Sequence, residues 1–366
     1  MSATMAKLGL EFYSSRVREI EGECVFLNIS GDFLVAGSSS GQVTCWSVTS
    51  GSEIWRREFD GPCSNSDISG AVLYFTESNK VHSIGLQSGE VLWALELEGS
   101  SDFVRCSNKS LWVTSSVYNF EIQDYSEGTI WKLGLDGSEI QSWNIEGRAW
   151  ALSSVNDRAI LGLSRPNCGF AIVTEQDEVE YFSLENESPV TVGEEDEGPV
   201  VILGHTNGEI TLVNNGDVSS FKIGSSAVTA IGAYRGWIAG LESGELLVGE
   251  EFGSWSTNLE GGIEIISIGP SLNHSRGIWA SSRGSGVNLV LIEVVNGTLE
   301  LGFSHPSRIG AVCSSGSVIC FGDSDGNIFI LEEEVLRLRF ARSEEESAER
   351  EKISMMRKKI RGLRRR

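Results

Sequence analysis

Residues 33–61 read FLVAGSSSGQVTCWSVTSGSEIWRREFDG, and residues 72–99 read VLYFTESNKVHSIGLQSGEVLWALELEG. Both stretches follow one plan: a hydrophobic run, a turn, a second run, a Ser-Gly turn, and a last run that ends in a hydrophobic residue, an acid and Gly. Short runs separated by such turns are typical of antiparallel strands. A repeat of about 40 residues built from four short strands predicts a β-propeller. Propellers include both enzymes and binding proteins, so the repeat alone defines no function.

Glycines align at two turns of the unit. The first turn reads SSSGQV, HTNGEI, LESGEL and DSDGNI in different units, which aligns Gly41, Gly208, Gly244 and Gly326. The second turn reads TSGSEIW, QSGEVLW, SEGTIW and VNGTLEL, which aligns Gly51, Gly89, Gly128 and Gly297. A hairpin turn requires a positive φ at such positions, and Gly adopts it without steric cost. The two columns therefore predict hairpins at fixed places in each unit.

The units begin near residues 23, 62, 100, 148, 190, 225, 262 and 308. This spacing predicts an all-β propeller of eight four-stranded blades over residues 1–340, with seven blades as the alternative because unit 4 is degenerate. Residues 18–22, REIEG, repeat the unit ending ahead of the first complete unit. We therefore expect residues 10–22 to give the last blade its outer strand, which would close the ring. Residues 335–340, VLRLRF, also alternate and compete for that place.

The composition indicates a cytoplasmic protein with reduced thiols. The first ten residues lack an apolar signal-peptide core, and no run approaches the ~18 apolar residues of a membrane span. Seven cysteines are scattered singly without a CxxC pair, so we expect reduced thiols, and we expect Cys24, Cys45, Cys313 and Cys320, which lie in strand-like runs, to be buried structural residues. The formal net charge is −22, which disfavours binding of nucleic acid or anionic membrane by the propeller itself.

The C-terminal segment 341–366 has the opposite charge, with ten basic and five acidic side chains. From about residue 344 it is rich in helix formers, and Ile353, Met356, Ile360 and Leu363 recur at helical spacing. We predict a basic amphipathic helix. Its candidate partner-binding or nucleic-acid-binding residues are Lys352, Arg357, Lys358, Lys359, Arg361, Arg364, Arg365 and Arg366.

Four interpretations of this tail remain open. It docks on the acidic propeller or on a protein partner, it binds RNA, DNA or the ribosome, it anchors to an anionic membrane, or it is an inert frayed end. Of these four interpretations, docking of the tail on the propeller or on a protein partner is favoured, and anchoring to a membrane is disfavoured. No aromatic residue lies within 344–366, so base stacking has no support.

Three segments contain a Ser/Thr-Gly turn closely followed by Trp: residues 50–55, 88–93 and 128–131. They resemble the PQQ-like (quinoprotein-like) propeller repeat and overlap with the WD-repeat pattern, although the paired Gly-His and Trp-Asp signatures of the latter are absent. The resemblance implies that Trp55, Trp93 and Trp131 pack between blades. It does not imply quinone-dependent catalysis, because the adjacent cysteine pair and the export signal of those dehydrogenases are missing.

No segment has the spacing of a catalytic, cofactor or metal site. The four histidines, His82, His205, His274 and His305, lie in different units, and His205 is expected to face solvent because it precedes a turn. The segment 323–327, DSDGN, has the oxygen-rich pattern of a calcium loop, but it falls in the first glycine column, which favours a plain turn. The acidic run 194–197 is interpreted as a solvated loop, with a basic partner as the alternative.

The sequence thus predicts a monomeric, non-catalytic scaffold without cofactors, which binds protein partners through its rims and its basic helix. Nucleic-acid or ribosome binding through the tail is one alternative. The other is an enzyme whose residues converge on the central channel from several blades, a constellation that sequence spacing does not reveal.

Overall fold

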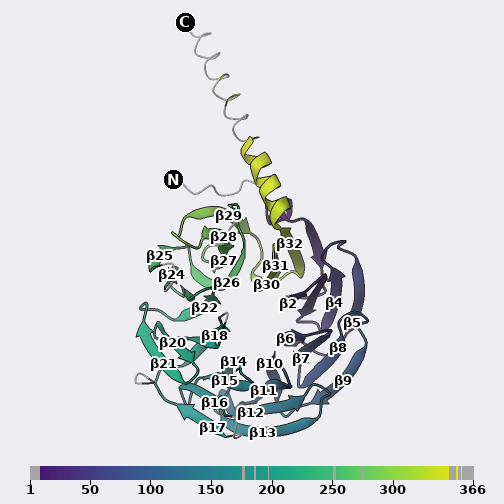
Figure 1. The fold of residues 1–366 in the computed structure, drawn as a ribbon, viewed down its shortest axis with the longest axis vertical. Coiled ribbons are helices and arrows are strands. Elements are labelled where there is room, and N and C mark those ends of the chain that lie inside the picture. The colour runs from purple at the N-terminus through teal and green to yellow at the C-terminus, as the bar shows by residue number, and fades with distance from the viewer. Residues whose placement is uncertain are drawn as a thin grey trace.

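The computed structural model shows a ring of eight four-stranded antiparallel sheets around a central channel (Figure 1). It describes residues 9–345 except 175–177, 185–186, 197, 250–252 and 274–275, and in addition Lys352 and Met356. The predicted eight-bladed propeller is therefore confirmed, and the alternative of seven blades is wrong. The blades begin within three residues of the predicted unit starts, because the repeat follows the strand boundaries closely.

In blades 1 to 7 the strands run in sequence order from the channel to the rim (Figure 1). Blade 1 consists of β2 (Cys24–Ser30), β3 (Phe33–Ser38), β4 (Gln42–Ser47) and β5 (Glu53–Glu58), and blade 2 of β6 (Cys63–Ser69), β7 (Val72–Glu77), β8 (Lys80–Gly85) and β9 (Val91–Glu96). Blade 3 consists of β10 (Ser100–Cys106), β11 (Ser110–Asn119), β12 (Asp124–Gly134) and β13 (Glu139–Glu146), and blade 4 of β14 (Ala149–Val155), β15 (Arg158–Leu163), β16 (Gly169–Val173) and β17 (Val179–Phe182). Blade 5 consists of β18 (Val190–Glu195), β19 (Val200–His205), β20 (Glu209–Asn214) and β21 (Asp217–Lys222), and blade 6 of β22 (Val228–Ala233), β23 (Trp237–Leu241), β24 (Glu245–Val248) and β25 (Trp255–Asn258). Blade 7 consists of β26 (Gly262–Pro270), β27 (Arg276–Arg283), β28 (Val287–Glu293) and β29 (Leu299–His305).

Blade 8 joins the two ends of the chain. It contains β30 (Ile309–Ser315), β31 (Val318–Asp323) and β32 (Asn327–Glu332), and its outermost strand is β1 (Arg16–Glu19), which pairs antiparallel with β32. Before β1, Leu10–Tyr13 forms the short helix α1. The innermost strands β30 and β2 are in contact, so the ring is continuous (Figure 1).

The first glycine column meets two requirements at once. Gly41 and Gly326 have φ values of +88° and +85°. A Cβ on Gly41 would lie 2.5 Å from the carbonyl oxygens of Phe59 and Gly61, and one on Gly326 would lie 2.1 Å from that of Ile20. The turn between the second and third strands therefore lies directly against the segment that leaves the fourth strand. In blade 8 that segment comes from the N-terminus, which places Ile20 where Phe59 lies in blade 1.

Gly128 does not belong to the second glycine column. It lies within the third strand of blade 3, four residues after the strand begins, where a Cβ would meet the Gly147 carbonyl at 2.4 Å, much as one on Gly41 would meet the Gly61 carbonyl. The turn between the third and fourth strands of blade 3 instead contains Gly137, with a φ of +85°. The Gly and Trp of the segment SEGTIW have a spacing like that of the second glycine column, which explains the wrong assignment.

The polypeptide continues after β32 as a helix over residues 333–345, which projects from the edge of the ring (Figure 1). Residues 335–340 are thus helical, and the predicted C-terminal helix is confirmed, although it begins earlier than expected. Leu336 is fully buried in a core cluster with Leu10 and Tyr13. Arg337 Nε donates to the Ser271 carbonyl at 3.1 Å. The base of the helix is thereby fixed to blade 7 and to the N-terminal segment.

The hydrophobic core is divided into clusters that lie between neighbouring blades. One cluster joins blades 1 and 2 through Val35, Trp55 and Phe75, and another joins blades 3 and 4 through Ile130 and Leu161. Because each blade buries its two faces only against its neighbours, the ring as a whole is the stable unit. Within the part of the chain described above, no helix is long and apolar enough to cross a membrane.

Candidate protein-binding surface

The hairpin of β11 and β12 is longer than its counterparts in the other blades. Its strands span ten and eleven residues, whereas β3 and β4 span six each. Pairing continues beyond Ser116↔Gly128 to Tyr118↔Tyr125 and Asn119↔Asp124. Since Gly128 corresponds to the turn glycine of blade 1, residues 117–127 extend past the common edge of the ring. We call residues 117–127 the blade 3 hairpin.

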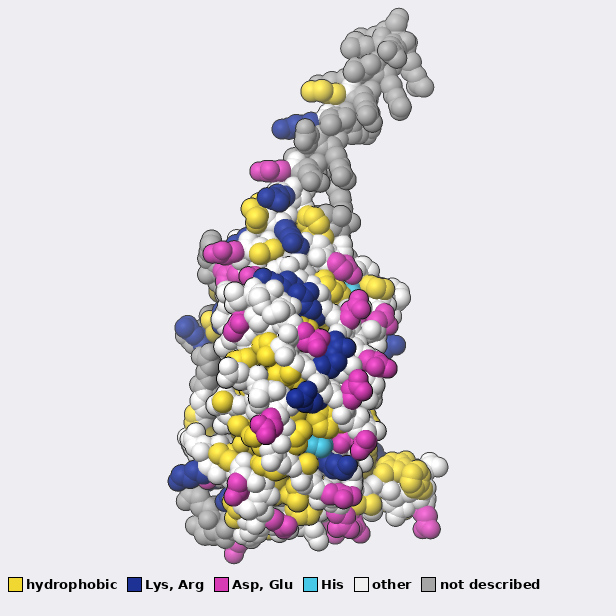
Figure 2. Space-filling model, turned by 90° about the vertical axis from the view of Figure 1, so that its right-hand side faces the viewer, with side chains coloured by type: hydrophobic (Ala, Val, Ile, Leu, Met, Phe, Trp, Pro, Cys, Tyr) yellow, Lys and Arg dark blue, Asp and Glu magenta, His cyan; other side chains and the backbone are white. Residues whose placement is uncertain are grey.

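Large hydrophobic side chains project from this hairpin into solvent. Phe120 is 85% exposed, Ile122 60% and Tyr118 42%. Figure 2 shows a hydrophobic projection at the lower edge of the molecule, the part of the ring that blade 3 forms in Figure 1. Exposed hydrophobic side chains that gather in one place mark interaction sites more often than isolated ones do.

The aromatic rings of the hairpin form a row of edge-to-face contacts. The ring centre of Tyr118 lies 5.2 Å from that of Phe120 and 5.3 Å from that of Tyr125. Tyr125 in turn lies 6.4 Å from Trp150 at the start of blade 4. Edge-to-face pairs of this kind each contribute about 0.5–1.5 kcal/mol beyond their buried area. The hairpin is therefore supported along its side by its own rings and by the next blade.

Arg148, in the link between blades 3 and 4, holds this row of rings in place. Its guanidinium carbon lies 4.7 Å from the ring centre of Tyr125 and 4.8 Å from that of Trp150. One Nη donates to the Tyr125 hydroxyl at 2.8 Å, and the other pairs with Asp102 Oδ1 at 2.6 Å. Burial raises the pKa of Asp102, and the charge of Arg148 opposes that rise. The base of the blade 3 hairpin therefore has little conformational freedom, and this holds the exposed tip in place.

An acidic cleft of about 580 Å³ lies beside the base of the hairpin. Its carboxylates come from Glu98, Glu127 and Glu146, and Tyr181, 48% exposed, adds an aromatic wall. Among the residues that the structure describes, none of these three carboxylates forms an ion pair. Burial, reinforced by the charge of Glu146, raises the pKa of Tyr181. The cleft therefore favours a cationic group over an anionic one.

The central channel forms a second cavity, of about 480 Å³, lined by the innermost strands of seven blades. Its polar groups mainly connect blades: Asp67 Oδ2 accepts the Cys106 amide at 2.7 Å, and Asn65 Oδ1 accepts from Arg105 at 2.7 Å. Glu264 Oε2 accepts from Arg308 Nε at 3.0 Å. The histidines that the structure describes lie elsewhere, so no pair of a nucleophile and a histidine base is formed here.

The acidic run 194–197, interpreted above as a solvated loop, lies in part within a strand. Glu194 and Glu195 lie in β18, on the channel side of blade 5, and Glu195 Oε1 accepts the Ser154 amide of blade 4 at 2.6 Å. Glu194 is exposed at the wall of the channel, but the blades around it exclude part of its solvent, and this partial desolvation raises its pKa. Asp196 accepts the Gly236 amide at 3.2 Å, and Glu197 lies outside the described residues.

A further expectation, that His205 faces solvent, was wrong. His205 is fully buried, with Nε2 2.8 Å from Thr211 Oγ1 and Nδ1 3.2 Å from the Ser188 carbonyl, and burial lowers its pKa. Trp55 and Trp93 contact the next blade as the resemblance implied, with Nε1 donating to the carbonyls of Leu86 and Leu135 at 2.7 and 3.0 Å. Trp131 also packs between blades, against the cluster shared by blades 2 and 3, although it lies in the third strand and its Nε1 donates to Ser115 Oγ within its own blade at 3.0 Å.

The segment DSDGN forms a turn. Asp323 is fully buried, and its Oδ1 accepts the amides of Asp325 and Asn327 at 3.0 and 2.8 Å, while its Oδ2 lies 3.0 Å from His305 Nε2. These carboxylate oxygens are engaged within the protein, and no group of metal ligands occurs among the described residues. All seven cysteines are free thiols.

Most of the tail residues fall outside the described part of the chain. Lys352 and Met356 are described and exposed, so the side chain of Met356 does not dock on the propeller. The other predicted partner-binding residues lie outside it: Arg357, Lys358, Lys359, Arg361, Arg364, Arg365 and Arg366. The hairpin surface was not predicted, although unit 3 was visibly long and Tyr118, Phe120 and Ile122 continue a strand-like alternation past the turn.

Comparisons with known proteins agree with this architecture. Residues 11–137 match the family described as outer membrane protein assembly factor BamB. The crystal structure of BamB from Moraxella catarrhalis is similar with a TM-score of 0.66 at 12% identity, over 87% of this chain and 99% of that one. The chain is an eight-bladed β-propeller that resembles PQQ-like and WD-repeat-like propellers.

Two other solved structures show the same fold. This propeller is similar to Sqt1 from Saccharomyces cerevisiae, with a TM-score of 0.70 at 12% identity over 87% of this chain and 98% of that one. It is equally similar to the computationally designed Ika8 protein, with a TM-score of 0.70 at 16% identity over 86% and 98%. No curated protein sequence matches the chain. Identities this low establish the fold and not a shared function.

Proposed function

We propose that this propeller is a non-catalytic protein-interaction platform that binds a partner through the blade 3 hairpin and the acidic cleft beside it. The observation that carries the proposal is Phe120, 85% exposed at the end of a hairpin that Arg148 and Tyr125 hold in place. Tyr, Trp and Arg dominate the binding energy of protein interfaces, and rigid aromatic side chains lose little conformational entropy on binding.

The charges around the hairpin specify the chemistry of the partner. Glu121 and Asp124 flank the exposed tip, and Glu98, Glu127 and Glu146 line the cleft at its base. A matching partner has an apolar groove for Phe120 and Ile122, with Lys or Arg side chains along one edge. Opposite charges of this kind raise the association rate and exclude wrong partners more than they raise affinity.

The roles of the channel carboxylates support a non-catalytic function. Asp67 and Glu195 each accept a backbone amide from a neighbouring blade, and Glu264 pairs with Arg308. Groups that are engaged in this way stabilise the ring. The similarity to BamB, described as an assembly factor, adds support for a binding role.

The test compares the proteins that tagged full-length wild type and two variants capture from their native cells, measured by quantitative mass spectrometry. Phe120→Ala with Ile122→Ala removes the hydrophobic tip, and Leu92→Ala removes a similarly exposed side chain on β9, away from the hairpin. We expect one set of partners to depend on the tip and to be unaffected by Leu92→Ala. An unchanged set of partners in the tip variant would contradict the proposal.

Nucleic-acid binding through the tail is the second candidate, because ten basic side chains are concentrated in residues 341–366 of an otherwise acidic chain. Here, deletion of residues 346–366 is expected to abolish RNA binding, and the affinity of the full chain is expected to fall steeply with salt. Equal RNA binding by the full and shortened chains would rule it out. The same deletion is expected to leave partners of the hairpin bound, which separates the two functions.

A further inference from the structure

Three blades use a tryptophan of the fourth strand to contact the next blade. Trp55, Trp93 and Trp255 cover the turn glycines Gly89, Gly137 and Gly297 of the following blades, where a Cβ would lie 2.6–2.7 Å from the indole. Each Nε1 donates to a carbonyl beside that turn, at 2.7, 3.0 and 3.0 Å. The space between adjacent blades near these turns is thus shaped for an indole ring.

Blade 5 has no tryptophan at the corresponding place. In blades 1 and 6 the tryptophan pairs with the residue four positions after the turn glycine, as Cys45↔Trp55 and Val248↔Trp255. In blade 5 the residue four positions after Gly208 is Leu212, and its partner is Ser219. A serine therefore replaces the large side chain at the interface of blades 5 and 6.

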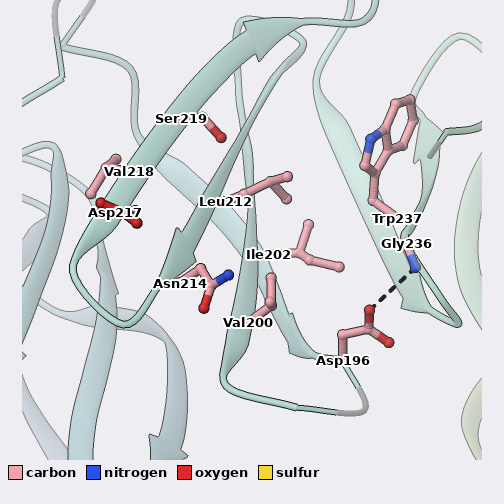
Figure 3. A pocket seen from close by; sticks show the side chains of 10 residues that line it. All are labelled: Asp196, Val200, Ile202, Leu212, Asn214, Asp217, Val218, Ser219, Gly236 and Trp237. Carbon is pink, nitrogen blue, oxygen red and sulfur yellow. Dashed lines mark hydrogen bonds between the residues drawn. The ribbon is translucent and has the colours of Figure 1, made fainter. Parts of the chain in front are cut away.

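A pocket of about 260 Å³ lies at this interface (Figure 3). Its apolar lining comes from Val200, Ile202 and Leu212 of blade 5 and Trp237 of blade 6, and Ser219 borders it. Pockets for whole small molecules are larger, about 300–1,000 Å³, so this one is of the size of a single large side chain. In Figure 3 the blade 5 side chains point towards the gap in front of Gly236 and Trp237.

The mouth of the pocket is acidic. Asp196 and Asp217 both line it, and Asp196 also accepts the Gly236 amide at 3.2 Å. Both residues lie at turns on the face of the ring opposite to the blade 3 hairpin, because the turns on either side of a strand lie at its opposite ends. This site is therefore separate from the surface of the proposed function, and its test does not depend on that proposal.

We propose that the pocket between blades 5 and 6 binds a tryptophan side chain from a basic segment of a partner protein. The incoming indole takes the place that Trp55, Trp93 and Trp255 occupy within this chain, and a neighbouring Lys or Arg lies against Asp196 and Asp217. The apolar walls contribute by removing the ring from water, and the carboxylates select a cationic flank.

Indole and tryptamine are suitable probes, measured by calorimetry and ligand-observed NMR on the full-length protein. We expect saturable 1:1 binding of indole, and binding of tryptamine about two- to fivefold tighter because of its ammonium group. Ser219→Trp fills the pocket, so it is expected to abolish indole binding and to raise the Tm, whereas Ser219→Ala retains binding. Asp217→Asn, an exposed turn substitution, is expected to reduce the preference for tryptamine.

Three results would overturn the proposal: indole that does not saturate the wild-type protein, indole that still binds a folded Ser219→Trp variant, or equal affinities for indole and tryptamine. If Ser219→Trp does not fold, the comparison of wild type and Asp217→Asn decides, since a tryptamine preference that Asp217→Asn does not reduce also overturns the proposed acidic mouth. Loss of hairpin partners on Phe120→Ala is independent of all these results.

Discussion

Arg148 holds the hydroxyl and the ring of Tyr125 at the same time: it donates to the oxygen at 2.8 Å while its guanidinium carbon lies 4.7 Å from the ring centre. Tyr125 belongs to the hairpin of blade 3, and Arg148 to the link that starts blade 4. The exposed tip is thereby attached to two blades rather than to one. The partner of Arg148, Asp102, is 6% exposed, so the base of the hairpin rests on a buried ion pair.

Replacing Arg148 by Met is expected to loosen the hairpin and to lower the free energy of unfolding by about 3 kcal/mol, because it leaves the Asp102 carboxylate buried without its partner. Urea denaturation measures the stability, and hydrogen exchange over residues 117–127 measures the loosening. Adding Asp102→Asn to Arg148→Met should recover part of the stability but not the slow exchange. Unchanged exchange in Arg148→Met would show that the hairpin is rigid without the arginine.

The tryptophans between blades are expected to carry much of the stability of the ring. Trp55→Ala removes a ring that is 6% exposed and should cost about 3–5 kcal/mol. Gln141, half-buried, occupies the corresponding position in blade 3, where Lys132↔Gln141 takes the register of Cys45↔Trp55. Gln141→Ala should stay within about 0.5 kcal/mol of wild type. Urea denaturation compares the two variants. Similar losses in the free energy of unfolding would contradict the larger contribution expected from the tryptophan.

The blades could be predicted from sequence because they depend on local features. In blades 1, 5 and 6 the first-column glycine is required by the positive φ of its own residue and by a carbonyl of the same unit, so the pattern repeats with the unit. This dependence on local features also explains the wrong assignment of Gly128, because the residues next to it imitate those of the turn between the third and fourth strands. Sequence letters alone do not distinguish a glycine within the third strand, such as Gly128, from one in the turn that follows the strand.

The binding surface could be predicted only in part, because it joins residues of different blades. Tyr118, Phe120 and Ile122 show strand alternation that continues past the expected turn, and this signal was present in the sequence. Nothing in the sequence connects Tyr125 to Arg148 and Trp150, more than twenty residues later in the next blade. His205 shows the same limit, since its hydrogen-bond partners are Ser188, which precedes β18, and Thr211 of β20.

Ring closure is expected to make Gly326 less replaceable than other glycines with positive φ. Gly216 has a φ of +100° and open space around it, whereas a Cβ on Gly326 would lie 2.1 Å from the Ile20 carbonyl. Gly216→Ala should therefore cost only the ~1–2 kcal/mol of a left-handed backbone. Gly326→Ala should cost clearly more and should weaken the pairing of β1 with β32, measured by hydrogen exchange of residues 16–19. Equal costs would show that the N-terminal segment moves away freely.

Asp323 is expected to act as a structural acceptor and not as a calcium ligand. Burial tends to raise its pKa, but hydrogen bonds from His305 and Asn327 outweigh burial and lower the pKa below its ordinary 3.8. Its contribution to stability is therefore present above that value and is lost as the pH falls through the lower folded-state pKa. Asp323→Ala should cost about 3 kcal/mol at neutral pH and less in strong acid. A Tm that rises on adding calcium to the wild type would contradict this assignment.

Glu194 is expected to affect stability in the opposite direction. Burial in the channel, with a contribution from the charge of Glu195, raises its pKa above the ordinary 4.5, and Arg105 only partly opposes the rise. The unfolded chain therefore loses this proton at a lower pH than the folded protein, so the free energy of unfolding falls as the pH rises from 4.5 through the folded-state pKa.

The Glu194→Gln variant lacks the ionisable group and so avoids this loss of stability. Its free energy of unfolding should match that of the wild type near pH 4 and exceed it near pH 7. Glu121→Gln, an exposed substitution at the hairpin tip, should change stability by less than about 0.5 kcal/mol at either pH. Urea denaturation at both values measures the difference, and a Glu194→Gln variant that is less stable at neutral pH would show that the carboxylate, paired with Arg105, holds blades 3 and 5 together.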